Sequence, residues 1–438
     1  MLFERPETGE RALILQVELQ QQENPEVAEF VELAGSAGLE VVEVVTARRA
    51  APHARHFVGS GKVDELRHAV RGRRADLVLI NHELSAGQQR NLERALDCRI
   101  MTRTELILTI FATRAQSHEG QLQVELAQLQ HAQTRLVRGW THLDRQKGGI
   151  GLRGAGEKQI ELDQRMLSER IKATQKRLAG VVKRRGQSRR GRRRSGAATV
   201  ALVGYTNAGK STLFNRLTDA AVYAEDQLFA TLDPTLRRLR IGGLTDVVLA
   251  DTVGFVSLLP HALVDAFKAT LEEVVHADLL LHVVDAADPQ WSLRIEQVRT
   301  VLTDIGAAQV PEIIVFNKID LLEPGAQVEW GVLDGLGPDD EICPVSAHTG
   351  AGIEDLLAQL GSRLGVVSPH EVVLAPSAGK TRAWLYAADA VVAETVLDDG
   401  CISLILQADE HLLAQLRDFE PLSLRASEHP QKISNGHS

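Results

Sequence analysis

The sequence predicts an α/β protein whose largest domain is built on a mostly parallel sheet. Short apolar runs alternate with helix-like stretches in both halves of the chain, which is typical of parallel strands that are buried on both faces. The runs of the second half end in polar motifs, and the first of them breaks into a glycine-rich turn. Between the two halves, apolar residues recur at helical spacing and predict two long helices.

Composition and charge narrow the classes of protein that this chain can be. With 438 residues, of which 44% are hydrophobic, the chain can bury two or three cores. Its formal net charge of −9 argues against a generally basic surface for nucleic acid. The three cysteines form no metal-spaced pair, no apolar run is long enough to cross a membrane, and the N-terminus is no signal peptide. We therefore expect a cytoplasmic protein without a membrane span, and we expect it to be monomeric.

Residues 1–115 are expected to form a small α/β domain with a parallel sheet. Gly59-Ser60-Gly61-Lys62 precedes one of its helices, without the spacing of a complete phosphate-binding loop. This segment is either a glycine turn or an auxiliary contact for a nucleotide or RNA. The strands are predicted at 11–19, 39–47 and 75–84, and the helices at 25–38, 63–72 and 86–97.

Residues 116–182 carry two helical stripes that predict an antiparallel hairpin. The stripes consist of Leu122, Leu126, Leu129 and Leu136, and of Ile160, Leu167, Ile171, Thr174, Leu178 and Val181. The connection between them, residues 139–157, has too many glycines for a helix. It is either a plain solvated linker or a basic tip that contacts RNA. The basic residues in and beside it are Arg145, Lys147, Arg153 and Lys158.

An arginine-rich linker, residues 183–196, joins this hairpin to the next domain. Residues 183–194 include eight basic and no acidic residues, so the rest of the chain is more acidic than its net charge indicates. Like charges at this density favour an extended, disordered segment. They also favour RNA as a partner, because each phosphate contact adds a salt-dependent contribution to binding. The candidates for such contacts are Arg189, Arg190, Arg192, Arg193 and Arg194.

A phosphate-binding loop is predicted near the start of residues 197–365. The spacing Gly204-x4-Gly209-Lys210-Ser211 follows an apolar run and precedes a helix-like stretch. Such a loop holds phosphates on its backbone N–H groups and on the helix N-terminus. Lys210 would reach the β- and γ-phosphates, and the Ser211 hydroxyl would hold Mg²⁺. The predicted phosphate contacts are Gly204, Tyr205, Thr206, Asn207, Ala208, Gly209, Lys210 and Ser211.

Three later motifs follow apolar runs and complete a guanine-nucleotide site. They are Asp251-Thr252-Val253-Gly254, Asn317-Lys318-Ile319-Asp320 and Ser346-Ala347-His348. Because the carboxyl ends of parallel strands meet at one edge of a sheet, these loops can surround one nucleotide. The motifs together predict a GTPase domain.

The shape of GTP assigns a role to each motif. Asp251 suits the Mg²⁺ shell, directly or through water, and the Gly254 amide can approach the γ-phosphate. Asp320 can accept the N1 and N2 protons of guanine, a pair of bonds that adenine cannot make. In the same interpretation Asn317 braces the loops, the Lys318 stem covers the base and the Ala347 amide meets guanine O6.

Residues 366–438 are expected to form a small α+β domain and a tail, whose function is not legible. Ser377-Ala378-Gly379-Lys380-Thr381 lacks the earlier glycine of a phosphate-binding loop, so we interpret it as an ordinary loop. Alternating stretches within 383–408 predict strands on both sides of an Asp-Asp-Gly turn.

Over nearly its whole length the chain resembles the HflX-type GTPases, a ribosome-associated family of the translation-factor class. The most specific marks are Gly148–Glu157, GYTNAGKS, LFATLDPT at 228–235, DTVGF at 251–255, NKID and SAH. The resemblance implies binding to the large (50S) ribosomal subunit and its rRNA, splitting of stalled ribosomes under stress, and ATP binding by the N-terminal domain. Where the family has a Gly-Pro-Gly-Glu-Thr run, this chain has Gly154-Ala155-Gly156-Glu157-Lys158, which frees the backbone of the tip.

The resemblance also implies that Thr231 closes on Mg²⁺ and the γ-phosphate, with Thr235 as the alternative. The neighbouring GTP contacts are then Phe229, Ala230, Leu232 and Asp233. Phe255 and Val256 follow the DTVG motif, in place of the glutamine with which many GTPases orient water, so we expect slow hydrolysis until the ribosome supplies the missing stabilisation. Asn207 is either a turn residue or a ligand for K⁺. The catalytic candidates are Lys210, Thr231, Gly254 and Asn207.

Two other functions stay open at this stage. One is a nucleotide-regulated RNA-binding or RNA-remodelling protein, and the other is a signalling GTPase that acts through protein partners. The basic tip and the arginine run count against the second of these. Ribosome-stimulated GTP turnover separates the ribosome-acting GTPase from the RNA-remodelling protein.

Overall fold

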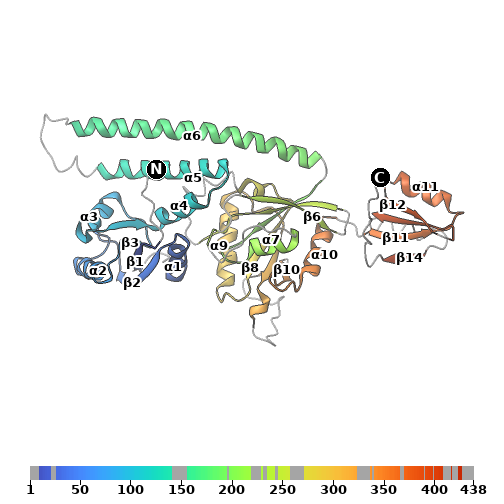
Figure 1. The fold of residues 1–438 in the computed structure, drawn as a ribbon, viewed down its shortest axis with the longest axis horizontal. Helices are drawn as coiled ribbons and strands as arrows, with labels where there is room; N and C mark the ends of the chain where they lie inside the picture. Colours follow the sequence, from blue (N-terminus) through green and yellow to red (C-terminus); the bar gives the residue numbers. More distant parts are fainter. Residues whose placement is uncertain are drawn as a thin grey trace.

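A computed structural model of the chain shows three sheets and a long helical hairpin (Figure 1). It describes residues 9–20, 26–140, 155–194, 197–218, 228–229, 234–241, 245–256, 271–322, 336–337, 340–365, 369–388, 390–397, 399–407, 416 and 423–426. Sheets of four, six and four strands follow one another along the chain. The predicted fold class is confirmed.

The N-terminal domain has a parallel sheet in the order β2-β1-β3-β4, with helices on both faces. Leu13 of β1 packs toward α2 and α3, and Ile14 packs toward α1 and α4. Alternate side chains of one strand therefore serve two cores, which explains why the strand is apolar throughout. The elements are β1 (Arg11–Leu19), α1 (Val27–Ser36), β2 (Glu40–Arg49), α2 (Ser60–Arg73), β3 (Leu77–Ile80), α3 (Ala86–Leu96), β4 (Arg99–Thr102) and α4 (Arg103–Arg114).

The hairpin consists of α5 (His118–Trp140) and α6 (Ala155–Arg194). Leu126 and Leu129 of α5 pack against Leu167 and Ile171 of α6, so the two predicted stripes face each other. Figure 1 shows α5 between α6 and the N-terminal domain. The helices extend into both ends of the predicted connection, and residues 141–154 lie outside the described part of the chain.

The arginine-rich segment was expected to be extended, and this expectation is wrong. Its backbone continues α6 without a break to Arg194, so that this helix has 40 residues. Arginine, lysine and glutamine are good helix formers, and a helix that is already nucleated gains one hydrogen bond for each residue added. Local charge repulsion is a weaker influence than this propagation.

The middle domain has a six-stranded sheet in the order β10-β9-β8-β5-β7-β6. All neighbouring strands are parallel except β6 and β7. The carboxyl ends of β5, β7, β9 and β10 therefore lie at one edge, and each leads into one of the predicted motifs. The elements are β5 (Thr199–Val203), α7 (Lys210–Thr218), β6 (Thr235–Ile241), β7 (Thr245–Asp251), β8 (Leu279–Asp285), α9 (Trp291–Asp304), β9 (Glu312–Asn317), the 3-10 turn η1 (Ile319–Leu321), β10 (Glu341–Pro344) and α10 (Ile353–Arg363).

The C-terminal domain has an antiparallel sheet in the order β12-β13-β11-β14. Its strands are β11 (Pro369–Leu374), β12 (Val391–Val396), β13 (Ile402–Gln407) and β14 (Ser423–Ala426). The predictions of a loop at 377–381 and a strand from 383 are wrong, because α11 (Gly379–Ala387) occupies most of this segment. Thr381 and Leu385, four residues apart, are the buried residues of this helix, so its apolar period is helical rather than alternating.

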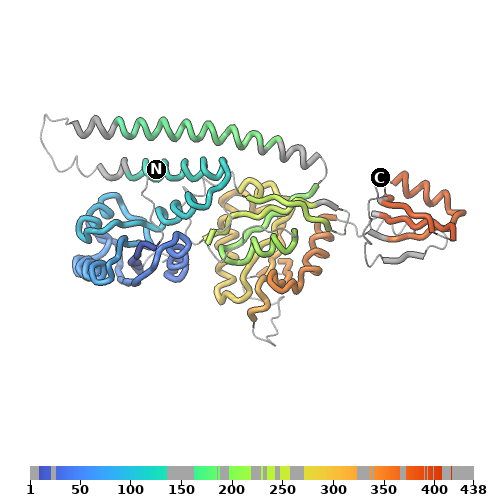
Figure 2. Tube along the Cα trace, in the orientation of Figure 1, coloured from blue at the N-terminus to red at the C-terminus, as the bar shows by residue number. Residues whose placement is uncertain are grey.

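The N-terminal and middle domains lie side by side (Figure 2), and one cluster of buried apolar residues includes side chains from both. The rings of Phe111 in α4 and Phe229 in the middle domain meet edge to face, with centroids 4.5 Å apart. Beside them, the backbone N–H of Leu228 donates to Ser36 Oγ at 3.1 Å. The segment just before the predicted switch threonine is thus held against the N-terminal domain. Among the described residues, no helix combines the length and hydrophobicity that crossing a bilayer needs.

Candidate functional site

The glycine-rich motif forms a tight loop between β5 and α7, at the carboxyl end of the central strand. Gly209 has φ 91°, and a Cβ atom there would lie 2.2 Å from Asn317 Nδ2. Only glycine fits this combination of backbone conformation and close approach. Asn207 also has a positive φ, of 61°, which asparagine tolerates better than most residues. The loop therefore brings its backbone close to Asn317, more than a hundred residues later in the chain.

Lys210 is buried behind this loop, with 6% of its surface exposed. Its Nζ donates to the carbonyl oxygens of Gly204, at 3.1 Å, and Tyr205, at 2.6 Å. Burial lowers the pKa of Lys210 to about 8, and the charge of Asp251 acts in the opposite direction. A lysine ammonium has three protons, so it can donate to a phosphate oxygen in addition to the two carbonyls.

Ser211 and Asp251 bring the start of α7 to the end of β7. The Ser211 hydroxyl donates to Asp251 Oδ2 at 2.8 Å, and the Asp251 side chain is fully buried. Hydroxyl and carboxylate oxygens are ligands that Mg²⁺ prefers, so the pair fits this ion. In the described part of the chain no group of three or more His, Cys, Asp or Glu residues could hold a metal.

Gly254 lies directly beside Lys210. A Cβ atom at Gly254 would come within 2.9 Å of Lys210 Nζ and within 2.8 Å of Thr206 Cγ2, so a side chain there would displace the lysine. The next residue is tied to the phosphate loop, because the Thr206 N–H donates to the Phe255 carbonyl at 2.7 Å. Phe255 and Val256 are apolar and buried, so neither provides a polar group that could orient water.

The NKID and SAH motifs meet at the carboxyl ends of β9 and β10. The Asn317 side chain donates to the Ala208 carbonyl and accepts from the Ala347 N–H, both at 2.9 Å. The Asp320 carboxylate accepts from Ser346 Oγ at 2.5 Å, which fixes its orientation. Lys318 Nζ pairs with Asp285 at 2.7 Å, and His348 is exposed at the rim. Three of the four predicted motifs are thus linked through one buried asparagine.

Some predicted residues do not join this arrangement. Thr235 is the first residue of β6 and lies opposite Asp251 in the ladder. Gly59 precedes α2 directly, and Lys62 in its first turn pairs with Glu65 at 2.7 Å. Lys158 and the arginines at 189, 190 and 192–194 lie in α6, but their side chains are outside the description. The residues wholly outside the described part of the chain are Ala230, Thr231, Leu232, Asp233, Arg145, Lys147 and Arg153.

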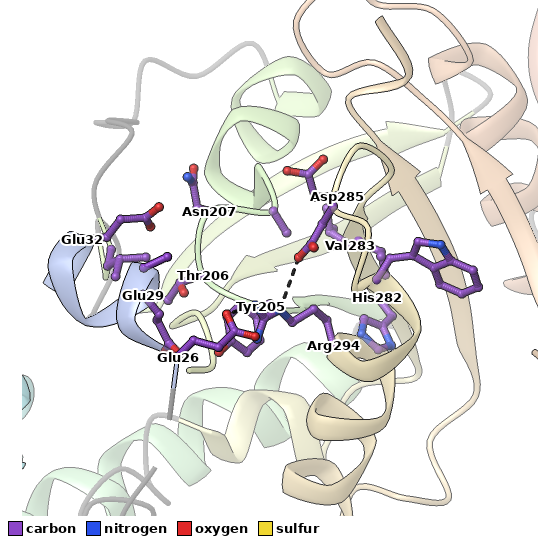
Figure 3. A pocket seen from close by; sticks show the side chains of 16 residues that line it. Glu26, Glu29, Glu32, Tyr205, Thr206, Asn207, His282, Val283, Asp285 and Arg294 are labelled. Carbon is purple, nitrogen blue, oxygen red and sulfur yellow. Dashed lines mark hydrogen bonds and ion pairs between the residues drawn. The ribbon is translucent and has the colours of Figure 1, made fainter. Parts of the chain in front are cut away.

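Helix α1 also lies beside this site, which the sequence did not predict. A cavity of about 230 Å³ lies between α1 and the phosphate loop (Figure 3). Glu26, Glu29 and Glu32 line it on one side, and Tyr205 and Arg294 line it on the other. Burial, and then the neighbouring Glu29, raise the pKa of Glu32. No local signal could have revealed this wall, because acidic residues on a helix ordinarily face solvent.

Known protein families match the N-terminal, hairpin, middle and C-terminal regions of the chain. Four family models match consecutive parts of the chain: "GTP-binding GTPase N-terminal" at 24–112, "GTP-binding GTPase Middle Region" at 114–192, "50S ribosome-binding GTPase" at 199–318 and "HflX C-terminal domain" at 336–417. The chain is 52% identical over 409 residues to GTPase HflX of Escherichia coli K12, covering 92% of this chain and 94% of that protein. It is 46% identical over 395 residues to GTPase HflX of Magnetococcus marinus, covering 89% of each. A GTP-binding protein of Sulfolobus solfataricus, solved in complex with GDP, aligns with a TM-score of 0.45 at 22% identity, over 81% of this chain and 99% of that one.

Proposed function

The chain belongs to the HflX family of GTPases and hydrolyses GTP to GDP and phosphate, and from this premise we propose that it dissociates or rescues stalled ribosomes at the large (50S) subunit, under stress. The observation that carries the proposal is that one chain combines the described nucleotide motifs with a long helical hairpin that is paired to the N-terminal domain.

In the proposed nucleotide site, each described motif serves one part of GTP. Lys210 and the loop N–H groups hold the β- and γ-phosphates, and Gly254 leaves room for the γ-phosphate. Ser211 and Asp251, which already contact each other, would hold Mg²⁺ together with Thr231, and the ion would neutralise phosphate charge when bound. Of these, Asp251 acts directly or through water.

Guanine selectivity is proposed for the base end of the site. Asp320, oriented by Ser346, accepts the N1 and N2 protons of guanine. The Ala347 N–H already bonds Asn317, so this loop is fixed before the base arrives. The stem of Lys318 covers one face of the base. Such a preformed site lowers the entropy lost on binding.

Ion pairs attach the hairpin to the N-terminal domain and join its two helices. Arg135 of α5 pairs with Glu105 of α4 at 2.8 Å, and both side chains are mostly buried. Arg170 of α6 pairs with Glu125 of α5, also at 2.8 Å. We place rRNA contacts at the basic connection and along the end of α6, where the sequence concentrates positive charge.

Slow intrinsic hydrolysis and stimulation by the ribosome form part of the proposal. Phe255 and Val256 leave the attacking water without a polar partner from these two positions. Asn207, which is exposed on the phosphate loop, is proposed as a ligand for K⁺, a cation that would then replace an arginine finger. Equal rates of ribosome-stimulated GTP hydrolysis in KCl and in NaCl would contradict the proposed role of K⁺. ATP binding at Gly59–Lys62 and a monomeric state stay predictions.

The test is steady-state GTP hydrolysis with purified large subunits, using wild type and a variant that lacks residues 148–156. We expect large subunits to accelerate turnover of the wild type, small subunits to have little effect, and the deletion to weaken the acceleration. Subunit separation on sucrose gradients then reports the splitting itself. Absence of any stimulation would overturn the ribosome assignment and favour the RNA-remodelling alternative.

A further inference from the structure

Arg294 joins the phosphate loop to the N-terminal domain. It lies in the first turn of α9, and its side chain is only 12% exposed. Its guanidinium donates to Glu26 at 2.7 Å and to Asp288 at 3.3 Å. The same group lies 4.3 Å from the centre of the Tyr205 ring, and Figure 3 shows Glu26, Tyr205 and Arg294 together.

Tyr205 is the residue through which this contact reaches the nucleotide site. Its ring is buried against Arg294, and its carbonyl accepts the shorter of the two hydrogen bonds from Lys210, at 2.6 Å. Tyr205 also pairs with Phe255 as an isolated parallel bridge. Holding the ring therefore holds the carbonyl that orients the lysine.

Glu26 is a fixed point of the N-terminal domain. Its carbonyl accepts from the Asn81 side chain at 3.2 Å, and Asn81 in turn accepts from Arg103 at 3.0 Å. Arg103 is paired with Glu29 at 2.9 Å, and both of these side chains are 5% exposed. Because this network is buried, the start of α1 cannot shift alone without breaking it.

We infer that Arg294 is a positioning residue that fixes Tyr205, and through it Lys210, while Glu26 of the N-terminal domain fixes Arg294. Nucleotide affinity then depends on where the N-terminal domain lies. This inference rests on the proposed role of Lys210 in phosphate binding. Burial is the largest single influence and opposes the charge of Arg294. The hydrogen bond that Arg294 donates to Glu26, the charges of Tyr205 and Glu26, and the hydrogen bond to Asp288 together raise the pKa of Arg294, so the arginine stays charged.

Arg299 provides a matched control on the same helix. It is also an arginine with two carboxylate partners, Glu312 at 2.6 Å and Asp340 at 2.8 Å. Both of these partners belong to the middle domain and lie at the amino ends of β9 and β10, whereas the nucleotide motifs follow the carboxyl ends of these strands. Loss of Arg299 therefore removes a comparable set of ion pairs without touching Tyr205.

The experiment measures the binding and release of a fluorescent GDP by the full chain. We expect R294A to weaken the affinity about tenfold, mainly through faster release, since it loses a largely desolvated cation–π contact together with two ion pairs. R294K should recover about half of this loss on a logarithmic scale, because it keeps the charge but not the planar group. R299A should stay within about twofold of the wild type.

The link to the N-terminal domain is tested by E26Q in both backgrounds. We expect E26Q to weaken binding about threefold in the wild type and to have no effect in R294A, because coupled residues are not additive. Melting curves of each variant show whether it is folded, and E26Q and R294K keep the test valid if R294A is not.

Three results would overturn the inference. The first is GDP affinity of R294A, or of R294K if R294A is unfolded, that equals the wild type. The second is a loss in R299A equal to that in R294A, and the third is an effect of E26Q that persists in R294A. K210A separates this inference from the proposed site. If R294A and K210A both bind GDP normally, the proposed role of Lys210 itself is wrong. If K210A binds GDP weakly and R294A binds it normally, only the link through Arg294 is wrong.

Discussion

Replacing Asn317 by alanine should separate the two ends of the nucleotide site. The Asn317 side chain is 2% exposed and links the phosphate loop to the SAH loop through the Ala208 carbonyl and the Ala347 N–H, each at 2.9 Å. Both backbone groups belong to buried residues. N317A therefore leaves one buried acceptor and one buried donor without this partner.

The size of the effect follows from these two groups. An unsatisfied buried polar group costs roughly 1–3 kcal/mol, so the two together should lower the free energy of unfolding of the middle domain by about 3 kcal/mol. For a domain of this size, a loss of that size corresponds to a melting temperature lower by roughly 6–12 °C. GDP binding should weaken as well, because the loops at the two ends of the nucleotide are no longer held together.

Thermal unfolding of the nucleotide-free protein, followed by tryptophan fluorescence, measures this prediction. The matched control is N91A, which also removes an asparagine hydrogen bond to a backbone carbonyl, that of Arg55 at 3.0 Å, but this bond is exposed to solvent. N91A should lower the melting temperature by no more than about 2 °C. If N317A shifted the melting temperature no more than N91A and bound GDP normally, the bracing role of Asn317 would be refuted.

Three further predictions concern charge and packing. Burial lowers the pKa of Lys210 to about 8, and a bound phosphate raises this pKa again, so GDP binding above about pH 8 should take up a proton. In a fluorescent-GDP titration the affinity should therefore fall about tenfold between about pH 7 and about pH 9. A flat pH profile would contradict this prediction. R103L should lower the free energy of unfolding of the N-terminal domain by roughly 3–5 kcal/mol in urea, since it leaves Glu29 buried without its charge partner, and R103L/E29L should recover most of the loss. F229A removes a 2% exposed ring from the core between two domains and should cost roughly 3–5 kcal/mol, seen as faster proteolysis between them, whereas L321A, at a 64% exposed position, should change little.

Local pattern was sufficient to predict most of the fold. The strands of the N-terminal and middle domains are apolar runs, because parallel strands are covered on both faces, and the hairpin follows from residues at heptad spacing. Motif spacing predicts the glycines at 209 and 254, and the structure gives the reason: a Cβ atom at Gly209 would collide with Asn317, and one at Gly254 would collide with Lys210. Such motifs are readable because their chemistry depends on a few residues close together in the chain.

Prediction from local sequence pattern failed where helix propensity opposed the feature on which the prediction was based. Positive charge at 183–194 predicted an extended linker, yet the segment continues a helix that packing had already formed. In the C-terminal domain, Gly379–Ala387 resembled a loop and a strand, yet it forms a helix with Leu385 in the core. In both cases helix propensity and propagation outweighed the feature from which the prediction was made.

The sequence by itself therefore determined the nucleotide motifs and most of the individual strands and helices, since each of these depends on residues within a few positions of one another. Tertiary structure alone decided that α1 forms one wall of the cavity beside the phosphate loop, and that Arg294 reaches both Tyr205 and Glu26. Glu26 and Arg294 are 268 residues apart, and their contact depends on how two separately formed domains pack. The sequence around a charged residue does not indicate which distant residue will be its ion-pair partner. Only the packing of the two domains brings Glu26 and Arg294 together.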